Sequence, residues 1–165
     1  MISTEYPFIR KKKWNEVILP HTATIEPVIN SKPNWEGVCY YRKMFSVNKF
    51  KGKNLVVEFE AAMQQSDVWL NGQLVVQHKG GYSPFSVDIT HLVKYNSTNE
   101  IIVRLDNRPG KNFPVGKDQK RNGFTYWSGL YRSVFLHVTH PVHVTDAVKT
   151  NKINKTKYDV QGYIL

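Results

Sequence analysis

The chain has 165 residues, with 23 Lys or Arg against 13 Asp or Glu, and its formal net charge is +10. Its length suits one domain with a single core and the beginning of a second unit. No run approaches the ~20 apolar residues that a membrane span needs. The first residues lack the basic and apolar regions of a signal peptide. If the parent protein is periplasmic or secreted, its signal has been removed, so the location is left open.

The positive charge raises the question of a nucleic-acid partner. Four basic residues lie at 10–13 and four more between 149 and 157, so eight of the 23 are near the ends. Residues 14–148 hold 15 basic residues against 11 acidic ones. Clusters at chain ends are typical of solvated surface rather than of a track for phosphates. We therefore expect neither a nucleic-acid nor a membrane partner.

Short alternating runs joined by turn residues predict strands along the whole chain. Asn71-Gly72 between two apolar runs predicts a type I′ hairpin, and Asp88 or Thr90 can cap one helical turn over residues 89–94. The lone Cys39 reads as a small buried residue rather than a nucleophile. We expect strands at residues 16–19, 38–47, 54–60, 66–70, 73–78, 82–88, 100–106, 133–138, 142–148 and 158–165. Many strands without crossover helices predict an all-β antiparallel sandwich, for which a jelly roll is one solution.

Aromatic residues gather in the stretch 122–132, Asn-Gly-Phe-Thr-Tyr-Trp-Ser-Gly-Leu-Tyr-Arg. Two glycines bracket this cluster of rings, a composition that favours a loop presenting flat faces to a flat ligand. The loop is followed by a strand whose Val134, Leu136 and Val138 share one face. It is preceded by residues 106–123, which lack alternation, and a loop of that length in a compact domain is usually functional or mobile.

Seven ordered blocks together resemble the N-terminal sugar-binding domain of glycoside hydrolase family 2, over about residues 14–148. This family contains β-galactosidases, β-glucuronidases and β-mannosidases, and the pairing of Asn107-Arg-Pro with Asn122-Gly-Phe most resembles the bacterial β-galactosidase type. The blocks are Leu19-Pro-His-Thr22, Tyr40-Tyr-Arg-Lys-Met-Phe45, Val68-Trp-Leu-Asn-Gly72, His78-Lys-Gly-Gly-Tyr-Ser-Pro-Phe85, Asp88-Ile-Thr, Val103-Arg-Leu-Asp-Asn107 and Trp127-Ser-Gly-Leu-Tyr-Arg132.

The resemblance implies a galactose-binding-domain-like jelly roll that packs against an immunoglobulin-like domain and a barrel. The expected domains are residues 1–148 for the jelly roll and 149–165 for a linker and a first strand of the next domain. Catalysis in the family is retaining and uses two glutamates about 5 Å apart on the barrel. Asn15-Glu16 and Asn99-Glu100 resemble the acid/base motif but lack its barrel context. The chain should have no catalytic residue, while its parent would hydrolyse O-glycosyl bonds.

The resemblance also implies which residues contact the terminal sugar of a glycoside or oligosaccharide. Asn122 stands near a position where family members often carry aspartate, so an amide would replace a carboxylate. Asp106 and Asn107 follow a strand that ends near the pocket. Tyr126 and Trp127 could stack on a pyranose face, although for Trp127 packing between domains is an equal alternative.

Two further residues of the last block have a structural reading. Tyr131 and Arg132 are expected to brace the sandwich, Arg132 through a buried ion pair. His137, His140 and His143 are three apart, but in strands the first two would face opposite sides, so we assign no metal ligand. No cofactor is expected either.

Two other function classes are open at this point. A free-standing carbohydrate-binding module would bind sugar without partner domains, whereas a structural inter-domain module would carry a large bare apolar patch. The sugar, its anomer and linkage, and the oligomeric state are not specified by the residues.

Overall fold

The computed structural model describes residues 13–23, 35–48, 52–108 and 127–143, together with the backbone of residues 147–154 and 157–164. These residues form nine strands: β1 Val38–Ser46, β2 Asn54–Phe59, β3 Gln65–Leu70, β4 Gln73–Lys79, β5 Phe85–Asp88, β6 Thr98–Asp106, β7 Val134–Thr139, β8 Ala147–Asn154 and β9 Lys157–Ile164. None of the described residues belongs to a regular helix, and accordingly none forms a helix that could cross a membrane.

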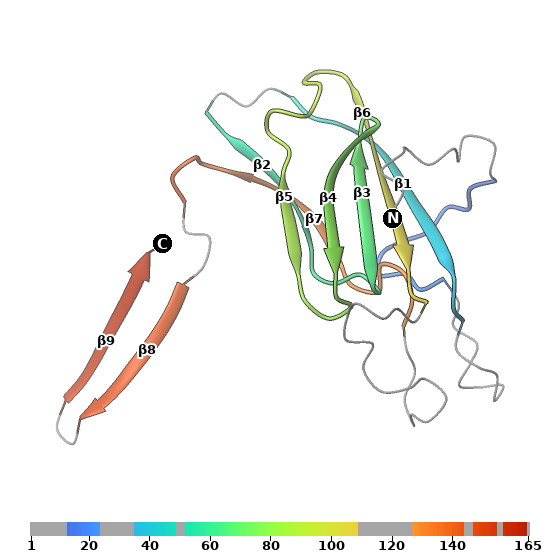
Figure 1. Cartoon of the computed structure of the whole chain (residues 1–165). Coiled ribbons are helices and arrows are strands. Elements are labelled where there is room, and N and C mark those ends of the chain that lie inside the picture. Colours follow the sequence, from blue (N-terminus) through green and yellow to red (C-terminus); the bar gives the residue numbers. More distant parts are fainter. Residues whose placement is uncertain are drawn as a thin grey trace.

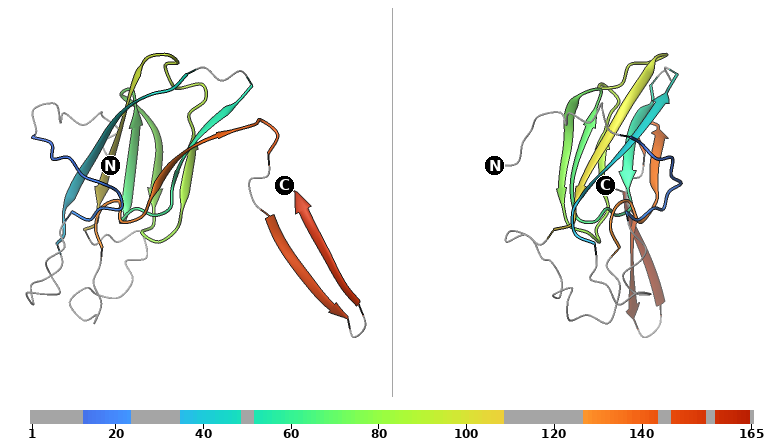
Figure 2. Two further views of the ribbon diagram at one scale, coloured as in Figure 1. Left: turned by 180° about the vertical axis from the view of Figure 1, so that it is seen from behind. Right: turned by 90° about the vertical axis from the view of Figure 1, so that its right-hand side faces the viewer.

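Two antiparallel sheets make up the body of the molecule. One has the strand order β1-β6-β3-β4 and the other has the order β5-β2-β7. Figures 1 and 2 show the two sheets as facing layers, with β8 and β9 as a separate two-stranded hairpin. The fold is an all-β jelly-roll sandwich, as the alternating runs predicted.

The core lies between the sheets and follows the period-two alternation of the strands. In β2, Leu55, Val57 and Phe59 are at most 5% exposed. Val103 and Leu105 of β6 meet them from the opposite layer in the same cluster. The alternation that predicts strands at residues 54–60 and 100–106 implies this one-sided burial.

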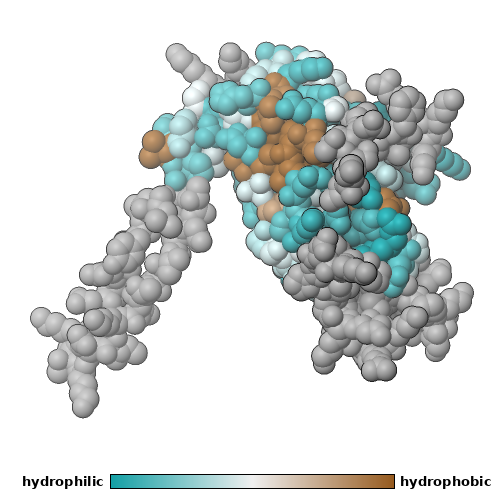
Figure 3. Space-filling view, viewed as in Figure 1, coloured by the Kyte–Doolittle hydropathy of each residue, from teal (hydrophilic) through white to brown (hydrophobic). Residues whose placement is uncertain are grey.

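The outer face of the four-stranded sheet holds a second, smaller cluster. Trp69 and Ile102 are each 2% exposed there, packed against Trp14, Tyr40 and Leu74. Strand β6 is therefore buried on both faces, which its alternation did not predict. Figure 3 shows a hydrophobic area in the upper part of one side of the molecule, surrounded by mainly hydrophilic residues.

Two local predictions are confirmed by the backbone. Asn71 has φ of 52° and Gly72 has φ of 88°, the positive values that a type I′ hairpin requires. After β5, the Val93 amide donates to the Ile89 carbonyl over 3.1 Å, which closes a single helical turn. Asp88 caps that turn by accepting from the Thr90 amide at 2.8 Å.

Other local predictions were wrong. Residues 16–19 form no strand, and the described residues just after Pro141 are irregular rather than extended. Residues 149–154 and 157, outside the strands expected at 142–148 and 158–165, belong to β8 and β9, which pair from Ala147 opposite Ile164 to Asn154 opposite Lys157. Short polar runs carry little periodic signal, so pairing with a neighbouring strand decides their conformation. Where the domain boundary falls stays a prediction.

The first testable prediction concerns Asn99, which is 0% exposed. Its Oδ1 accepts from the Lys94 amide at 2.7 Å and from Asn71 Nδ2 at 2.9 Å, while its Nδ2 donates to two carbonyls. Asn99→Ala should lower the free energy of unfolding by about 3 kcal/mol, because four hydrogen bonds of one buried side chain are lost together. Urea denaturation measures this, with exposed Asn48→Ala as the control; equal stability of the two variants would contradict it.

Candidate functional site

The candidate residues that the structure describes gather at the end of the sandwich where β6 stops. Asp106 is the last residue of β6 and Asn107 follows it. Trp127 begins the segment that precedes β7, and this segment is joined to the same end by the Met63 amide, which donates to the Gly129 carbonyl at 3.0 Å. Asn122 and Tyr126 lie outside the described residues, so their expected sugar contacts stay predictions.

Asn107 is 3% exposed and its amide is engaged with the segment before β1. Oδ1 accepts from the Gly37 amide at 2.7 Å, and Nδ2 donates to the Trp35 carbonyl at 2.7 Å. The side chain therefore holds residues 35–37 against the end of β6. A direct contact between Asn107 and sugar stays a prediction.

Asp106 is held between two arginines. Oδ2 lies 2.9 Å from Arg104 Nη2 and 2.6 Å from Arg108 Nη2, and Oδ1 accepts from the Arg108 amide and Nε. Burial acts to raise the pKa of Asp106, but the hydrogen bonds and charge of Arg108 and the charge of Arg104 outweigh it, so the pKa is lowered. The carboxylate stays ionised and organises two cationic side chains at this end.

Trp127 is 47% exposed, although the residue after it is buried. Ser128 Oγ and Thr22 Oγ1 lie 3.1 Å apart, and the Ser128 amide donates to Thr22 Oγ1 at 3.2 Å. The His21 amide also donates to the Leu130 carbonyl at 2.8 Å. We call these contacts between residues 21–22 and 128–130 the backbone clamp. It holds the backbone next to Trp127 while the indole ring itself is exposed.

A side-chain hydrogen bond connects the backbone clamp to β1. His21 Nδ1 lies 2.9 Å from the Tyr41 hydroxyl. Burial raises the pKa of Tyr41 to about 12, so this hydroxyl remains protonated at neutral pH. Sequence reasoning identified His21 only as part of a block, since its partner Tyr41 lies on a separate strand.

Gln64 is a residue that sequence reasoning missed. It is 5% exposed, and its Nε2 is buried without a hydrogen-bond partner among the described residues. Its own backbone is fixed, because its amide donates to the Asp106 carbonyl and its carbonyl accepts from the Gly80 amide. No strand alternation marks this position, which lies just before β3.

The bracing role expected of Tyr131 is confirmed, and that of Arg132 is wrong. The Tyr131 hydroxyl donates to the Gly81 carbonyl. Arg132 is exposed, and among the described residues no ion pair of Arg132 is found. Both residues lie in the irregular segment before β7, where no strand pairing fixes the direction of the next side chain.

The three histidines after β7 begins have separate surroundings. His137 pairs with Glu58 at 2.6 Å, whereas His140 and His143 bond to backbone carbonyls. Within the part of the chain that is described, no group of three metal-ligating side chains is present. Burial raises the pKa of the Cys39 thiol to about 11, which leaves it unreactive at neutral pH.

Comparison with known proteins places this end of the sandwich in context. The family model described as "Glycosyl hydrolases family 2, sugar binding domain" matches residues 9–141. The chain belongs to this family of sugar-binding domains. A β-galactosidase of Thermoanaerobacter pseudethanolicus is 36% identical over 133 residues, which are 79% of this chain and 18% of that protein.

Two further relatives agree. A β-glucuronidase of Formosa agariphila is 34% identical over 146 residues, covering 80% of this chain and 15% of the relative. The crystal structure of a candidate β-galactosidase from Bacteroides fragilis superposes with a TM-score of 0.76 at 33% identity, covering 92% of this chain and 24% of that one. This chain thus spans less than a fifth of the length of the β-galactosidase of Thermoanaerobacter pseudethanolicus and of the β-glucuronidase of Formosa agariphila.

A second prediction tests the clamp beside Trp127. Gly129 has φ of 82°, and an added Cβ would lie 3.2 Å from the His21 carbonyl oxygen and collide with the Tyr41 hydroxyl. Gly52 has φ of 63° and open space around it. Gly52→Ala should cost about 1 kcal/mol of unfolding free energy, and Gly129→Ala about 2 kcal/mol more. If Gly129→Ala and Gly52→Ala lose the same stability in thermal and urea denaturation, the close packing of Gly129 against His21 and Tyr41 would be contradicted.

A third prediction uses the pH dependence of Asp106. Because its folded pKa is lowered, Asp106 contributes stability above ~pH 4, the usual pKa of an unfolded Asp. This contribution is lost as the pH falls through the folded pKa. The difference in unfolding free energy between the natural chain and Asp106→Asn should therefore shrink on acidification. When Asp106→Asn is added to Arg108→Gln, the loss of unfolding free energy at neutral pH should be smaller than in the natural chain. An effect of Asp106→Asn that does not change with pH would contradict the lowered pKa of Asp106.

Proposed function

We propose that this chain is the non-catalytic N-terminal domain of a retaining glycoside hydrolase of β-galactosidase type. Its loops complete the sugar pocket of a catalytic barrel that lies elsewhere in the parent polypeptide. The observation that carries the proposal is the half-exposed Trp127, presented beside the backbone clamp of Thr22 and Ser128 at the end where β6 stops. An indole ring held outward is suited to stacking on the face of a pyranose.

The carboxylates of the described residues do not offer the two reactive glutamates that a retaining mechanism requires. Glu100 lies 2.7 Å from Arg42, and Glu16 lies in an irregular exposed segment. Asp67 and Asp106 share Arg104 between them. These pairings favour structural roles, so the chemistry is assigned to the proposed barrel, with an immunoglobulin-like domain as a second partner.

Other side chains at this end have graded roles in the proposal. Asp106 presents Arg104 and Arg108, and Asn107 fixes residues 35–37, so both would shape the pocket as well as contact a hydroxyl. Gln64 Nε2 is a buried donor without a described partner and would pair with a ligand or a neighbouring loop. Asn122 and Tyr126 complete the proposed set of sugar contacts.

The preferred sugar is left open between galactose and glucuronic acid. The relatives include a β-galactosidase and a β-glucuronidase at similar identity. A free-standing carbohydrate-binding module predicts shifts of the Trp127 indole signal when galactosides are added to the chain alone. The proposal predicts no such shift at sugar concentrations of about 10 mM, because only part of the pocket is present.

The fourth prediction tests the proposal in a chimera. This chain replaces the matching segment of the Thermoanaerobacter pseudethanolicus β-galactosidase, which supplies the rest of the enzyme. Trp127→Ala should raise KM for a nitrophenyl galactoside about tenfold, with a smaller effect on kcat, because it removes a stacking contact. Trp127→Tyr should restore most of the affinity. Met44→Ala, equally exposed at 47%, is the control; an unchanged KM in Trp127→Ala would refute the stacking role.

A further inference from the structure

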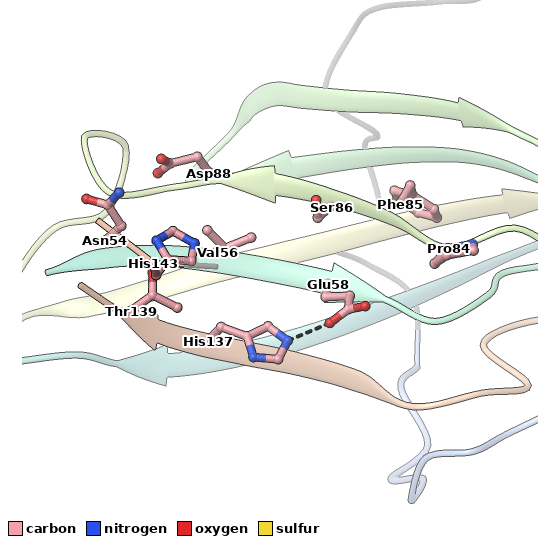
Figure 4. A pocket seen from close by; sticks show the side chains of 10 residues that line it. All are labelled: Asn54, Val56, Glu58, Pro84, Phe85, Ser86, Asp88, His137, Thr139 and His143. Atoms are coloured by element: carbon pink, nitrogen blue, oxygen red, sulfur yellow. Dashed lines mark hydrogen bonds and ion pairs between the residues drawn. The ribbon is translucent and has the colours of Figure 1, made fainter. Parts of the chain in front are cut away.

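A separate groove lies on the outer face of the three-stranded sheet. Its volume is about 650 Å³, within the range of small-molecule sites. The alternation that buries Leu55 and Val57 turns the other residues of β2 toward this face, and the same holds for β5 and β7. Figure 4 shows the groove and the side chains that line it: Asn54, Val56, Glu58, Pro84, Phe85, Ser86, Asp88, His137, Thr139 and His143.

The charges of the groove differ from those of the whole chain. It is lined by two carboxylates and no Lys or Arg, although the chain carries a net charge of +10. The pKa of Asp88 is lowered mainly by a hydrogen bond from the Thr90 hydroxyl, with further contributions from the Thr90 amide and the charge of His91. These outweigh the effect of burial, so this carboxylate is charged. An anionic ligand is therefore disfavoured at this face, whereas a neutral one rich in hydroxyl groups is not.

The polar groups of the groove are suited to sugar hydroxyls. Glu58 Oε2 lies 2.6 Å from His137 Nε2, and both side chains are about two-fifths exposed, at 39% and 42%. Carboxylate, imidazole, hydroxyl and amide groups together offer both donors and acceptors. Thr139 adds a buried Oγ1 that has no hydrogen-bond partner among the described residues, and it pairs in register with Asn54.

An aromatic platform lies next to these polar groups. Phe135 is directly opposite Glu58 in the β2–β7 pairing and is 46% exposed. Its ring centroid is 5.9 Å from that of His137. A flat exposed ring beside paired donors and acceptors matches the two kinds of surface on a pyranose, its C–H face and its hydroxyl edge.

We propose that this groove is a second carbohydrate site, which binds neutral saccharide units. It is separate from the end of the sandwich where β6 stops and Trp127 is exposed, which we call the loop end. It shares no residue with the pocket assigned to Trp127, Asp106 and Asn107. The site would hold part of a neutral oligosaccharide or polysaccharide without contributing to its hydrolysis. It goes beyond the proposed function, since it requires neither the barrel nor the loop-end pocket.

The test is a residue-resolved NMR titration of the 165-residue chain. Galactotetraose and cellotetraose are the neutral probes, and tetragalacturonate is an anionic probe of equal length. We expect the neutral probes to shift the amide signals of Val56, Glu58, Ser86 and His137 with a Kd of about 1 mM, typical of a small open site. The uronate should bind at least about tenfold more weakly, because it meets two carboxylates.

Two variants and one control make the result specific. Ser86→Tyr fills the groove and should abolish the shifts, while Glu58→Gln should weaken neutral binding about tenfold through loss of a charged acceptor. Glu58→Gln should also narrow the gap between neutral and anionic probes. Glu100→Gln removes a glutamate that pairs with Arg42 on the opposite sheet, and should leave binding unchanged. Dispersed spectra show that each variant is folded.

Several outcomes would overturn the site. These are the absence of groove shifts at about 50 mM sugar, equal affinity for the uronate, and unchanged binding in Ser86→Tyr. Shifts confined to Asp106 and the Trp127 indole would also overturn it, and would indicate a free-standing loop-end site instead. Because the chimera reports the loop-end pocket through KM, failure of the groove and failure of the proposed function are read separately.

Discussion

The position at which β6 ends determines the geometry of the end of this domain that carries Trp127. Strand β6 is paired along both edges, with β1 and with β3. It is also packed on both faces, since Val103 and Leu105 lie in the core while Ile102 lies under Trp69. A strand enclosed on four sides cannot shift its register without exposing apolar residues. The residues that follow it, Asp106 and Asn107, are therefore placed with little freedom.

From those two residues the constraint extends to segments far apart in the sequence. Asn107 holds the backbone of residues 35–37, and the Asp106 carbonyl accepts from the Gln64 amide. Gly129 meets Met63, the neighbour of Gln64, and so attaches the Trp127 segment to the same end. The exposed ring is supported by buried polar contacts rather than by its own packing. A binding group on a loop is effective when the scaffold beneath it is rigid.

Local patterns in the sequence were enough to predict the strands and the hairpin, because alternation and Asn-Gly carry their own physical signal. Contacts between distant segments could not be predicted in the same way. Asn99 lies in a polar stretch of the sequence, yet it is buried, and its Oδ1 accepts from Asn71 Nδ2 in the turn between β3 and β4. Trp69 is buried on an outer face because Trp14 and Leu74 cover it. Arg132 was expected in a buried ion pair but is exposed, because burial depends on packing that the local pattern does not encode.

Strand β7 has exposed residues on both of its faces, and the two faces differ in chemistry. Leu136 and Val138 face the core side, opposite Val57 and Leu55, yet are 41% and 45% exposed, because the three-stranded sheet ends there. Apolar residues at an open edge suit burial by a neighbouring protein domain, such as those proposed for the parent. The outer face of the same strand carries the Glu58–His137 pair instead. Burying that pair under a domain would remove water from polar side chains at a cost, whereas a hydrated saccharide can replace the water with hydroxyl groups.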